Sequence, residues 1–394
     1  MDWQSFGYEG THYDEVGFPH PGELMRQGRQ KLGMTQEQLA EELGVSRSMI
    51  ARMENSGTGL DSIVTRRKLA KILGIAPIML GVISLEDVAK GSTHLYSTSI
   101  LKRTLHYHSE AYFSGASVGG IAEVQEMVQQ IFDISKGLNH KNKELLDVLC
   151  QYTQLGASIA YEEQDYKHAE WFSRWSVSLA SKLNDPILLA GGLMNLSSVL
   201  YRKDDLGNAQ KYIEEALALK LPPAIVGAVS LDAARIYSKS GVPGATKLLE
   251  KSTAIARKVA SWDTATIQAD TGYCYIRGAR IFLDQEDHKA AFEQIELAYD
   301  AVSPKFMRRR CLVQILQAEA LIAKGDYQDA VISADAALTL AKGLGANENL
   351  VKGQILKLAN LLKASPFGAF RDVTLFANRV SLFIGNRKIK PADC

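Results

Sequence analysis

Residue types that could carry catalysis or bind a metal are present in this chain, but their spacing favours neither chemistry. The eight histidines are scattered, and His106 and His108, two residues apart, would point about 200° from each other on a helix. The four cysteines form no CxxC pair and have no histidine at zinc-ligand spacing. No HExxH, GxxxxGK[ST], GxSxG or EF-hand motif occurs. We therefore expect no enzyme, no metal site and no cofactor.

Arginine and serine residues near residue 50 suit a different chemistry, the recognition of nucleic-acid bases. Thr35 can cap a helix that carries Gln38 three residues later, and Gly44 can supply the positive φ that turns the chain. Ser46 can then cap a second short helix. The outward face of that helix carries three polar side chains: Arg47, Ser48 and Arg52. Two helices at a steep angle, the second presenting such groups, have the geometry that fits the major groove of DNA.

The same segment resembles the Cro-like, or Xre-type, helix-turn-helix of bacterial and phage repressors. The resemblance rests on GELMRQGRQKLGMTQEQLAEELGVSRSMIARMENSGTG, with its QxxLAxxLGVS core and its MENxG exit. It implies that the chain binds double-stranded DNA, with Gln36 on a phosphate, the outward groups of the second helix at base edges, and further contacts to the DNA backbone. The DNA-binding residues expected on this basis are Gln36, Ser46, Arg47, Ser48, Arg52, Asn55, Arg66 and Arg67. The alternative is a domain of this type retained for packing or for binding a protein.

Length and composition place the chain among globular proteins of two or three domains, because it has 394 residues, of which 46% are hydrophobic and 23% are charged. The net charge is only +1, yet residues 22–82 hold nine Lys and Arg against six Asp and Glu. Any affinity for DNA must therefore come from a local basic face. No apolar run approaches the ~18 residues of a membrane span, and the N-terminus lacks a secretion signal. We expect a cytoplasmic protein with no membrane partner.

The spacing of apolar residues predicts helices from residue 22 onward and therefore an all-α fold. The expected parts are an N-terminal arm (1–21), a Cro-like helix-turn-helix bundle (22–82), a helical linker (83–120) and a repeat domain that binds a ligand and dimerises (121–394). The arm is either a mobile extension or a segment that docks on the rest of the protein. Within the linker we expect a helix starting near Ser84, another over 100–113 and a glycine-rich hinge over 114–120.

The repeat domain is predicted from small residues at regular positions. Five predicted second helices open at an alanine, 36 to 46 residues apart: Ala169, Ala209, Ala245, Ala291 and Ala330. Twelve residues before each lies another small residue: Ala157, Ser197, Ala233, Ala279 and Ala318. Small side chains at both positions let two antiparallel helices approach closely. The pattern resembles the tetratricopeptide repeat, which implies an α-solenoid of helix pairs over about 150–345, extended by helices at 121–136 and 349–384. An unrelated helical bundle is the alternative.

In such a stack the first helix of each pair lines a concave wall, and such walls bind extended peptides. With the frame fixed on the small residues, the expected peptide-binding residues are Gln154, Ser158, Tyr161, Met194, Asn195, Ser198, Tyr201, Arg202, Tyr237, Tyr273, Arg277 and Arg280. An Asn amide can pair with both the donor and the acceptor of a peptide backbone, and Arg can hold a carboxylate bidentately. A solvated polar face without a ligand is the alternative.

The combination of the two parts resembles the RRNPP-type quorum-sensing regulators of Gram-positive bacteria, in which an Xre-type domain is joined to tetratricopeptide repeats that bind a short signalling peptide. The resemblance implies a transcription regulator that changes its DNA affinity when a peptide occupies the repeat groove. We expect a homodimer, because one such domain contacts too few base pairs for specificity. Two other hypotheses stay open: a scaffold whose repeats bind a protein partner and whose helix-turn-helix tethers it to DNA, and an enzyme-like sensor.

Overall fold

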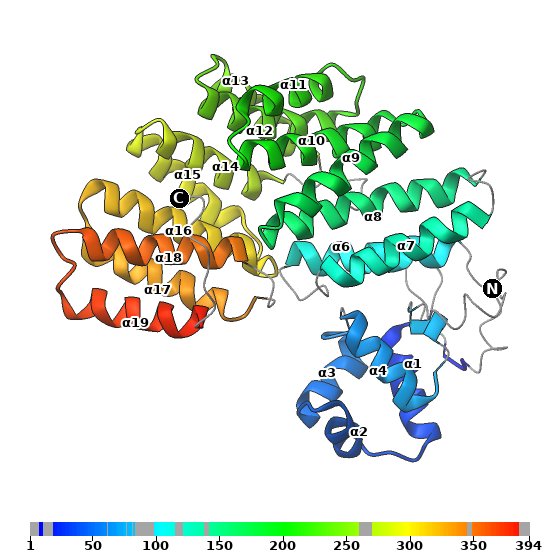
Figure 1. The fold of residues 1–394 in the computed structure, drawn as a ribbon. Helices are drawn as coiled ribbons and strands as arrows, with labels where there is room; N and C mark the ends of the chain where they lie inside the picture. The colour runs from blue at the N-terminus through cyan, green and yellow to red at the C-terminus, as the bar shows by residue number, and fades with distance from the viewer. Residues whose placement is uncertain are drawn as a thin grey trace. The chain divides into compact units, whose positions relative to one another are not determined.

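The computed structural model describes residues 8–10, 19–60, 62–75, 77–80, 82, 98–114, 121–137, 142–259, 270–344 and 349–385. Regular structure in these ranges is helical, without a β-strand, which confirms the all-α prediction (Figure 1). The chain forms two compact units, one of residues 1–112 and 116–152 and the other of residues 113–115 and 153–394. The expected domain bounds stay predictions. The helix expected near Ser84 lies outside the described residues, as does the expected hinge beyond Ser114.

The first unit begins with a bundle of short helices: α1 (Pro21–Lys31), α2 (Gln36–Leu43), α3 (Arg47–Ser56), α4 (Ile63–Leu73) and the 3-10 helix η2 (Pro77–Leu80). Its core is made of buried apolar side chains that include Met25, Leu39, Ile50 and Leu69. Gly22 allows α1 to lie directly against α3, because a Cβ at this position would come within 2.4 Å of the Met53 carbonyl oxygen. This packing holds α3 in place while leaving its other side to solvent.

Part of the N-terminal arm packs against α1. Tyr8 is buried, and its hydroxyl donates a hydrogen bond to Glu23 Oε2 at 2.9 Å. The Glu9 backbone N–H donates to Gln27 Oε1 at 3.3 Å. Residues 8–10 therefore behave as the docking interpretation of the arm expects. The rest of the arm up to residue 18 lies outside the described residues.

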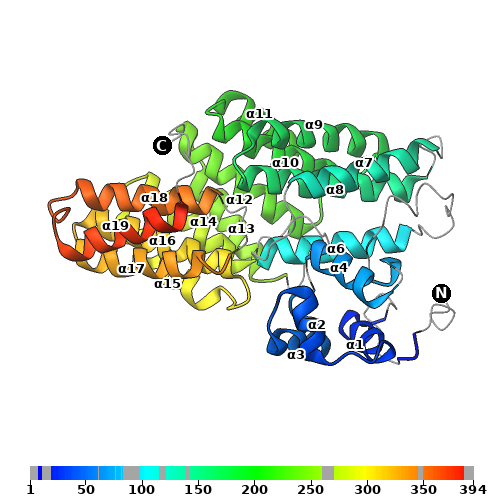
Figure 2. The same ribbon diagram turned by 60° about the horizontal axis from the view of Figure 1, so that its bottom comes forward.

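Longer helices follow: α6 (Thr98–Ser114), α7 (Ile121–Gly137), α8 (Lys143–Glu162), α9 (Tyr166–Leu183), α10 (Pro186–Arg202), α11 (Leu206–Leu217), α12 (Pro223–Ser240), α13 (Ala245–Ala256), α14 (Thr271–Asp284), α15 (His288–Ala301), α16 (Met307–Lys324), α17 (Tyr327–Ala341), α18 (Asn349–Ala364) and α19 (Arg371–Ile384). In the second unit successive helices pack in pairs, and α10, α12, α14, α16 and α18 contact one another in series (Figures 1 and 2). These first helices of the pairs thus form one continuous layer. We call this layer, together with α8, which is bonded to α10, the inner wall; it stands where the sequence analysis expects a concave wall.

The small residues that fixed the repeat frame are buried. All ten predicted positions are at most 5% exposed: Ala157, Ala169, Ser197, Ala209, Ala233, Ala245, Ala279, Ala291, Ala318 and Ala330. The sequence analysis missed a second repeat signal, an aspartate four residues before the alanine. Asp165, Asp205 and Asp287 each cap the second helix of a pair by accepting a backbone N–H. The frame of the helical repeats is therefore confirmed.

One hydrogen bond links the start of α18 to the residue that follows α8. Asn349 Nδ2, at the start of α18, donates to the backbone oxygen of Glu163 at 3.1 Å. Cys150, Cys274 and Cys311 are buried free thiols. Among the helices that the structure describes, none has the length and apolar character needed to cross a membrane.

Candidate nucleic-acid interface and inner wall

The turn between α2 and α3 is built as the sequence predicts. Thr35 Oγ1 accepts from the Gln38 backbone N–H at 3.2 Å, while Gln38 Oε1 accepts from the Thr35 N–H at 2.7 Å. Gly44 ends α2 with φ 72°, which L side chains rarely adopt. Ser46 Oγ accepts from the Met49 N–H at 3.3 Å and so caps α3. These local bonds set the direction in which α3 leaves the turn.

Helix α3 has one buried side and one exposed side. Ile50 and Met53 lie in the core, whereas Arg47, Ser48 and Arg52 are exposed. The structure thus brings the three expected base-contacting residues to one surface. In the protein without DNA, Arg47 Nε lies 2.9 Å from Glu37 Oε1, and both of these side chains are more than half exposed. Arg47 must leave this exposed ion pair to contact a base.

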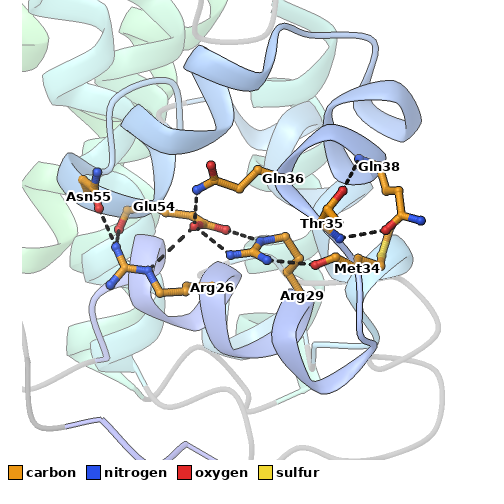
Figure 3. Close-up of polar contacts among 8 residues, drawn as sticks. All are labelled: Arg26, Arg29, Met34, Thr35, Gln36, Gln38, Glu54 and Asn55. Atoms are coloured by element: carbon orange, nitrogen blue, oxygen red, sulfur yellow. Dashed lines mark hydrogen bonds and ion pairs between the residues drawn. The ribbon is translucent and has the colours of Figure 1, made fainter.

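The buried side of α3 carries a carboxylate, Glu54, which is 3% exposed. Its hydrogen bonds join α3 to α1 and α2 (Figure 3). Arg29 of α1 donates through Nε to Glu54 Oε1 at 2.6 Å and through Nη2 to Oε2 at 3.1 Å. Gln36 of α2 donates through Nε2 to Oε2 at 2.9 Å. Arg26 Nε lies 3.7 Å from the same oxygen. We call these four residues the Glu54 network.

Electrostatics keep this carboxylate ionised. Burial by itself would raise the pKa of Glu54, but hydrogen bonds from Arg29 and Gln36 outweigh burial, so that the pKa lies below its usual value. The hydrogen bond to Glu54 in turn raises the pKa of Arg29. The sequence analysis did not single out Glu54 or either of its arginine partners. The sequence signal for this network is the pair Arg26 and Arg29, three residues apart on α1, together with Glu54, the one acidic residue in the sequence of α3.

Two of the expected phosphate-contacting residues are held by this network. Gln36 is half-buried, and its amide nitrogen is used by Glu54. Asn55 is exposed, and its Oδ1 accepts a hydrogen bond from Arg26 Nη2, which fixes the orientation of the amide. Ser46 is exposed at the start of α3, with its Oγ 2.9 Å from Ser48 Oγ. Contacts of all three with DNA stay predictions.

Arg66 is the exception among the expected DNA-binding residues. It is 1% exposed, donates through Nη1 to the Leu80 backbone oxygen at 3.0 Å and stacks on the Tyr107 ring at 5.1 Å. A phosphate contact by Arg66 is therefore wrong, because the side chain is enclosed between η2 and α6. Arg67 is partly exposed, with Nη2 3.6 Å from Glu126 Oε1.

The inner wall brings several of the expected peptide-binding residues together as stacked tyrosines and arginines. Arg202 Nε donates to the Tyr161 hydroxyl at 2.8 Å. Arg277 lies over the Tyr273 ring at 4.8 Å and donates to its hydroxyl. Tyr201 is covered by the guanidinium group of a residue that the sequence analysis missed, Arg235, at 4.6 Å, and Arg235 also donates to Ser198 Oγ at 2.7 Å.

Other expected wall residues serve packing instead. Gln154 is 1% exposed and donates through its amide to the Leu188 backbone oxygen at 2.7 Å, so direct contact of its side chain with a ligand is wrong. Asn195 is half-buried and donates through Nδ2 to the Gln154 backbone oxygen at 3.1 Å. Ser158 Oγ donates to the same oxygen at 3.1 Å. Met194 packs against the apolar core. These contacts tie α8 to α10.

Two further residues of the set have partners of their own. Tyr237 donates through its hydroxyl to Glu214 Oε1 of α11 at 3.1 Å. Because α11 is the second helix of its pair, this bond joins Tyr237 to a helix that is not part of the inner wall. Arg280 pairs with the Glu319 carboxylate and lies 4.0 Å from Asp284 Oδ1.

The described residues contain no group of three or more His, Cys, Asp and Glu side chains that could hold a metal ion.

Comparison with known proteins agrees with the bundle geometry. Residues 25–80 match the family model described as Helix-turn-helix, so the N-terminal bundle is a DNA-binding helix-turn-helix domain, as its resemblance to the Xre type implied. No curated protein sequence matches the chain.

Two solved structures are similar to parts of the chain. BtubC (BKLC) from P. vanneervenii is 17% identical, with 57% of this chain and 90% of that chain covered and a TM-score of 0.43. PlcR from Bacillus thuringiensis, solved in complex with the peptide PapR7 and DNA, is 17% identical, with 71% of this chain and 93% of that chain covered and a TM-score of 0.36.

Proposed function

We propose that this protein is a transcription regulator that binds operator DNA through α3 and senses a ligand, a short peptide, on the inner wall of its repeats. The observation that carries the DNA part is the two-sided character of α3, whose buried side is anchored in the bundle core while Arg47, Ser48 and Arg52 are exposed. The matched helix-turn-helix model supports the same assignment.

Each exposed group of the interface has a role suited to its chemistry. Arg47 and Arg52 contact guanine, since a guanidinium group can donate bidentately to O6 and N7. Ser48 is a permissive donor or acceptor at a base edge. Gln36, Ser46, Asn55 and Arg67 contact the DNA backbone and fix the register of α3. These roles need α3 to enter the major groove with its N-terminal half.

The protein acts in the cytoplasm as a homodimer, because two copies on half-sites ~34 Å apart supply the base contacts that one domain lacks. We assign the dimer contacts to the repeat unit, since the short helices of the bundle leave little surface for a strong interface. Ligand binding on the inner wall rests on the aromatic and arginine side chains gathered there, which offer stacking surfaces and bidentate donors.

Selection of bound sequences from random double-stranded DNA tests the DNA part with the full chain. The proposal expects a defined motif with two related half-sites, bound more weakly as salt rises. Mass spectrometry of small molecules that co-purify with the protein tests the ligand part. Recovery of unselected DNA would contradict specific DNA binding, and a peptide that co-purifies without altering DNA affinity would contradict the sensing role.

A further inference from the structure

Three arginines of consecutive first helices each lie over a tyrosine ring: Arg202 over Tyr161, Arg235 over Tyr201 and Arg277 over Tyr273. Arg202 of α10 donates to the Tyr161 hydroxyl, and the charges of Arg235 of α12 and Arg277 of α14 act on the same hydroxyl. These residues come from three consecutive first helices of the repeats, so the stacking of helix pairs is what brings them together. We call Arg202, Arg235 and Arg277 the arginine cluster.

The arginine cluster carries more positive than negative charge. In the described part of the chain, its three guanidinium groups have one paired carboxylate, Asp232, whose Oδ1 lies 3.4 Å from Arg235 Nη2. Another arginine of the same unit, Arg280, has more negative charge beside it. Arg280 has two acidic neighbours, Glu319 and Asp284, so its charge is balanced and that of the cluster is not.

Part of this charge is buried, while Arg202 and Arg277 are half-buried. Arg235 is 3% exposed, and neither its Nε nor that of Arg277 has a hydrogen-bond acceptor among the described residues. A buried N–H group without an acceptor costs free energy, and a buried cation without a counter-charge costs more. Groups of this kind persist where a further molecule supplies the acceptor.

The titration of Tyr161 agrees with this geometry. Burial alone would raise the pKa of this hydroxyl, but the charges of Arg202, Arg235 and Arg277 outweigh burial and lower the pKa below its usual value. A neutral phenol can accept one hydrogen bond from the cluster but cannot balance its charge. The surroundings of Tyr161 therefore favour negative charge.

We propose that Arg202, Arg235 and Arg277 form an anion subsite of the inner wall that binds a carboxylate of the ligand. This proposal rests on the ligand-sensing function proposed above and names the chemistry that the ligand must carry. Two arginines can hold a carboxylate through paired N–H donors while Tyr161 and the other rings cover its sides. The carboxylate belongs to a peptide, at its C-terminus or on an acidic side chain.

The first test measures the subsite itself with inorganic phosphate, an oxyanion with the same donor requirements, and with acetate. Thermal unfolding of the full chain is followed at constant pH and ionic strength while phosphate or acetate replaces chloride. A saturable rise in Tm is expected for the wild-type protein, since a ligand that binds only the folded state stabilises it. Both Arg277→Gln and Arg202→Gln should lose the rise, whereas Arg174→Gln, an exposed arginine of α9, should retain it.

Folding of each variant is checked by its Tm in chloride alone. Two cluster variants are used so that the test still stands if one of them does not fold. The subsite would be overturned if the Tm of the wild type did not rise with phosphate or acetate. It would also be overturned if the Tm of Arg277→Gln and Arg202→Gln rose as much as that of the wild type.

The second test separates the subsite from the proposed regulation. DNA affinity of the full chain is measured with random heptapeptide mixtures that have either a free C-terminus or a C-terminal amide, each made with or without Asp and Glu. Loss of the response on amidation assigns the C-terminal carboxylate, and loss on removal of acids assigns a side chain. A response indifferent to both changes and intact in Arg277→Gln would overturn the subsite while leaving peptide sensing in place. A Tm rise with no peptide response would overturn peptide sensing while leaving the subsite.

Discussion

Two of the regions that bury charge in this protein, the helix-turn-helix bundle and the inner wall, balance it differently. In the helix-turn-helix bundle, the Glu54 carboxylate is surrounded by Arg29, Arg26 and the Gln36 amide. On the inner wall, the arginine cluster has Asp232 as its paired carboxylate within the described residues. The first arrangement satisfies a charge within the fold, whereas the second contains two arginine Nε groups that have no acceptor among the described residues.

This difference distinguishes side chains that hold the helices together, which we call the framework, from side chains that we propose contact a ligand or DNA. The Glu54 network holds α1, α2 and α3 together, and so fixes the direction in which the exposed side chains of α3 face solvent. In the repeats the framework is apolar, built from the small residues and from side chains such as Leu200. Polar side chains of the inner wall differ in their roles: Gln154 and Asn195 tie α8 to α10, whereas Arg202 and Arg277 contact tyrosine rings and hydroxyls.

The largest effect is expected from breaking the Glu54 network. Glu54→Gln removes the charge that Arg29 pairs with, and removal of one partner of a buried ion pair costs ~3–5 kcal/mol. Hydrogen exchange of α1–α3 amides in the full chain should show this loss of stability locally. Glu41→Gln, an exposed acid of α2, is the matched control and should change little. A Glu54→Gln bundle as protected as the wild type would show that the network is not the framework.

A comparable effect in the repeats should come from an apolar residue. Leu200 is buried in α10, and Leu200→Ala should lower the free energy of unfolding by ~2–5 kcal/mol through the cavity that it opens. Denaturant unfolding of the full chain measures this. If Leu200→Ala cost less than Arg277→Gln, the repeat framework would be ionic and the contrast with the bundle would disappear.

Stability of the bundle should also depend on pH through Glu54. Its lowered pKa means that the carboxylate stabilises the folded state above the unfolded value of about 4.3, and that this contribution is lost as pH falls through the lower folded value. Hydrogen exchange or circular dichroism of the full chain in acid should show the loss below about pH 4. The dependence should be reduced in Glu54→Gln. Equal acid sensitivity of variant and wild type would assign the titration to other carboxylates.

Asn195 sharpens the boundary between framework and recognition, because it lies on the inner wall yet bonds the backbone of α8. Asn195→Ala should cost about 1 kcal/mol of stability, the usual contribution of one such hydrogen bond. The same unfolding experiment compares it with Leu200→Ala on the same helix. A loss as large as that of Leu200→Ala would place Asn195 in the framework.

The smallest effect is expected at the exposed pair of Glu37 and Arg47. Exposed ion pairs contribute up to ~1 kcal/mol, so Glu37→Gln should raise DNA affinity by a factor of up to ~5 by releasing Arg47 and removing a negative charge near phosphate. Fluorescence anisotropy with the selected DNA measures this, and Glu42→Gln, another exposed acid of α2, controls for charge alone. Equal gains in both variants would mean that the pair itself does not restrain Arg47.

Local features of the fold could be predicted from the sequence because they depend on neighbouring residues. The Thr35 and Gln38 capping bonds, the turn at Gly44 and the buried small residues of the repeats are of this kind. Sequence spacing predicted which side of α3 is exposed for the same reason, since helical periodicity fixes it.

Side chains whose surroundings come from distant segments could not be placed. Arg66 is covered by Tyr107, forty-one residues later, and Gln154 reaches the backbone of Leu188 in the next pair. Arg235 was missed because it directly follows the small residues of the packing side of α12, and its partners Ser198 and Tyr201 belong to the preceding pair. Contacts between repeats, unlike those within a helix, are not fixed by spacing.

The central claim, that α3 recognises DNA sequence, is tested most directly by comparing Arg47→Ala with the wild-type protein on the selected site and on random DNA at one salt concentration. Loss of a bidentate base contact should cost ~1–3 kcal/mol on the selected site and much less on random DNA. Gln36→Ala, as a backbone contact, should weaken binding to both by similar factors. An equal loss for Arg47→Ala on both DNAs would contradict the claim.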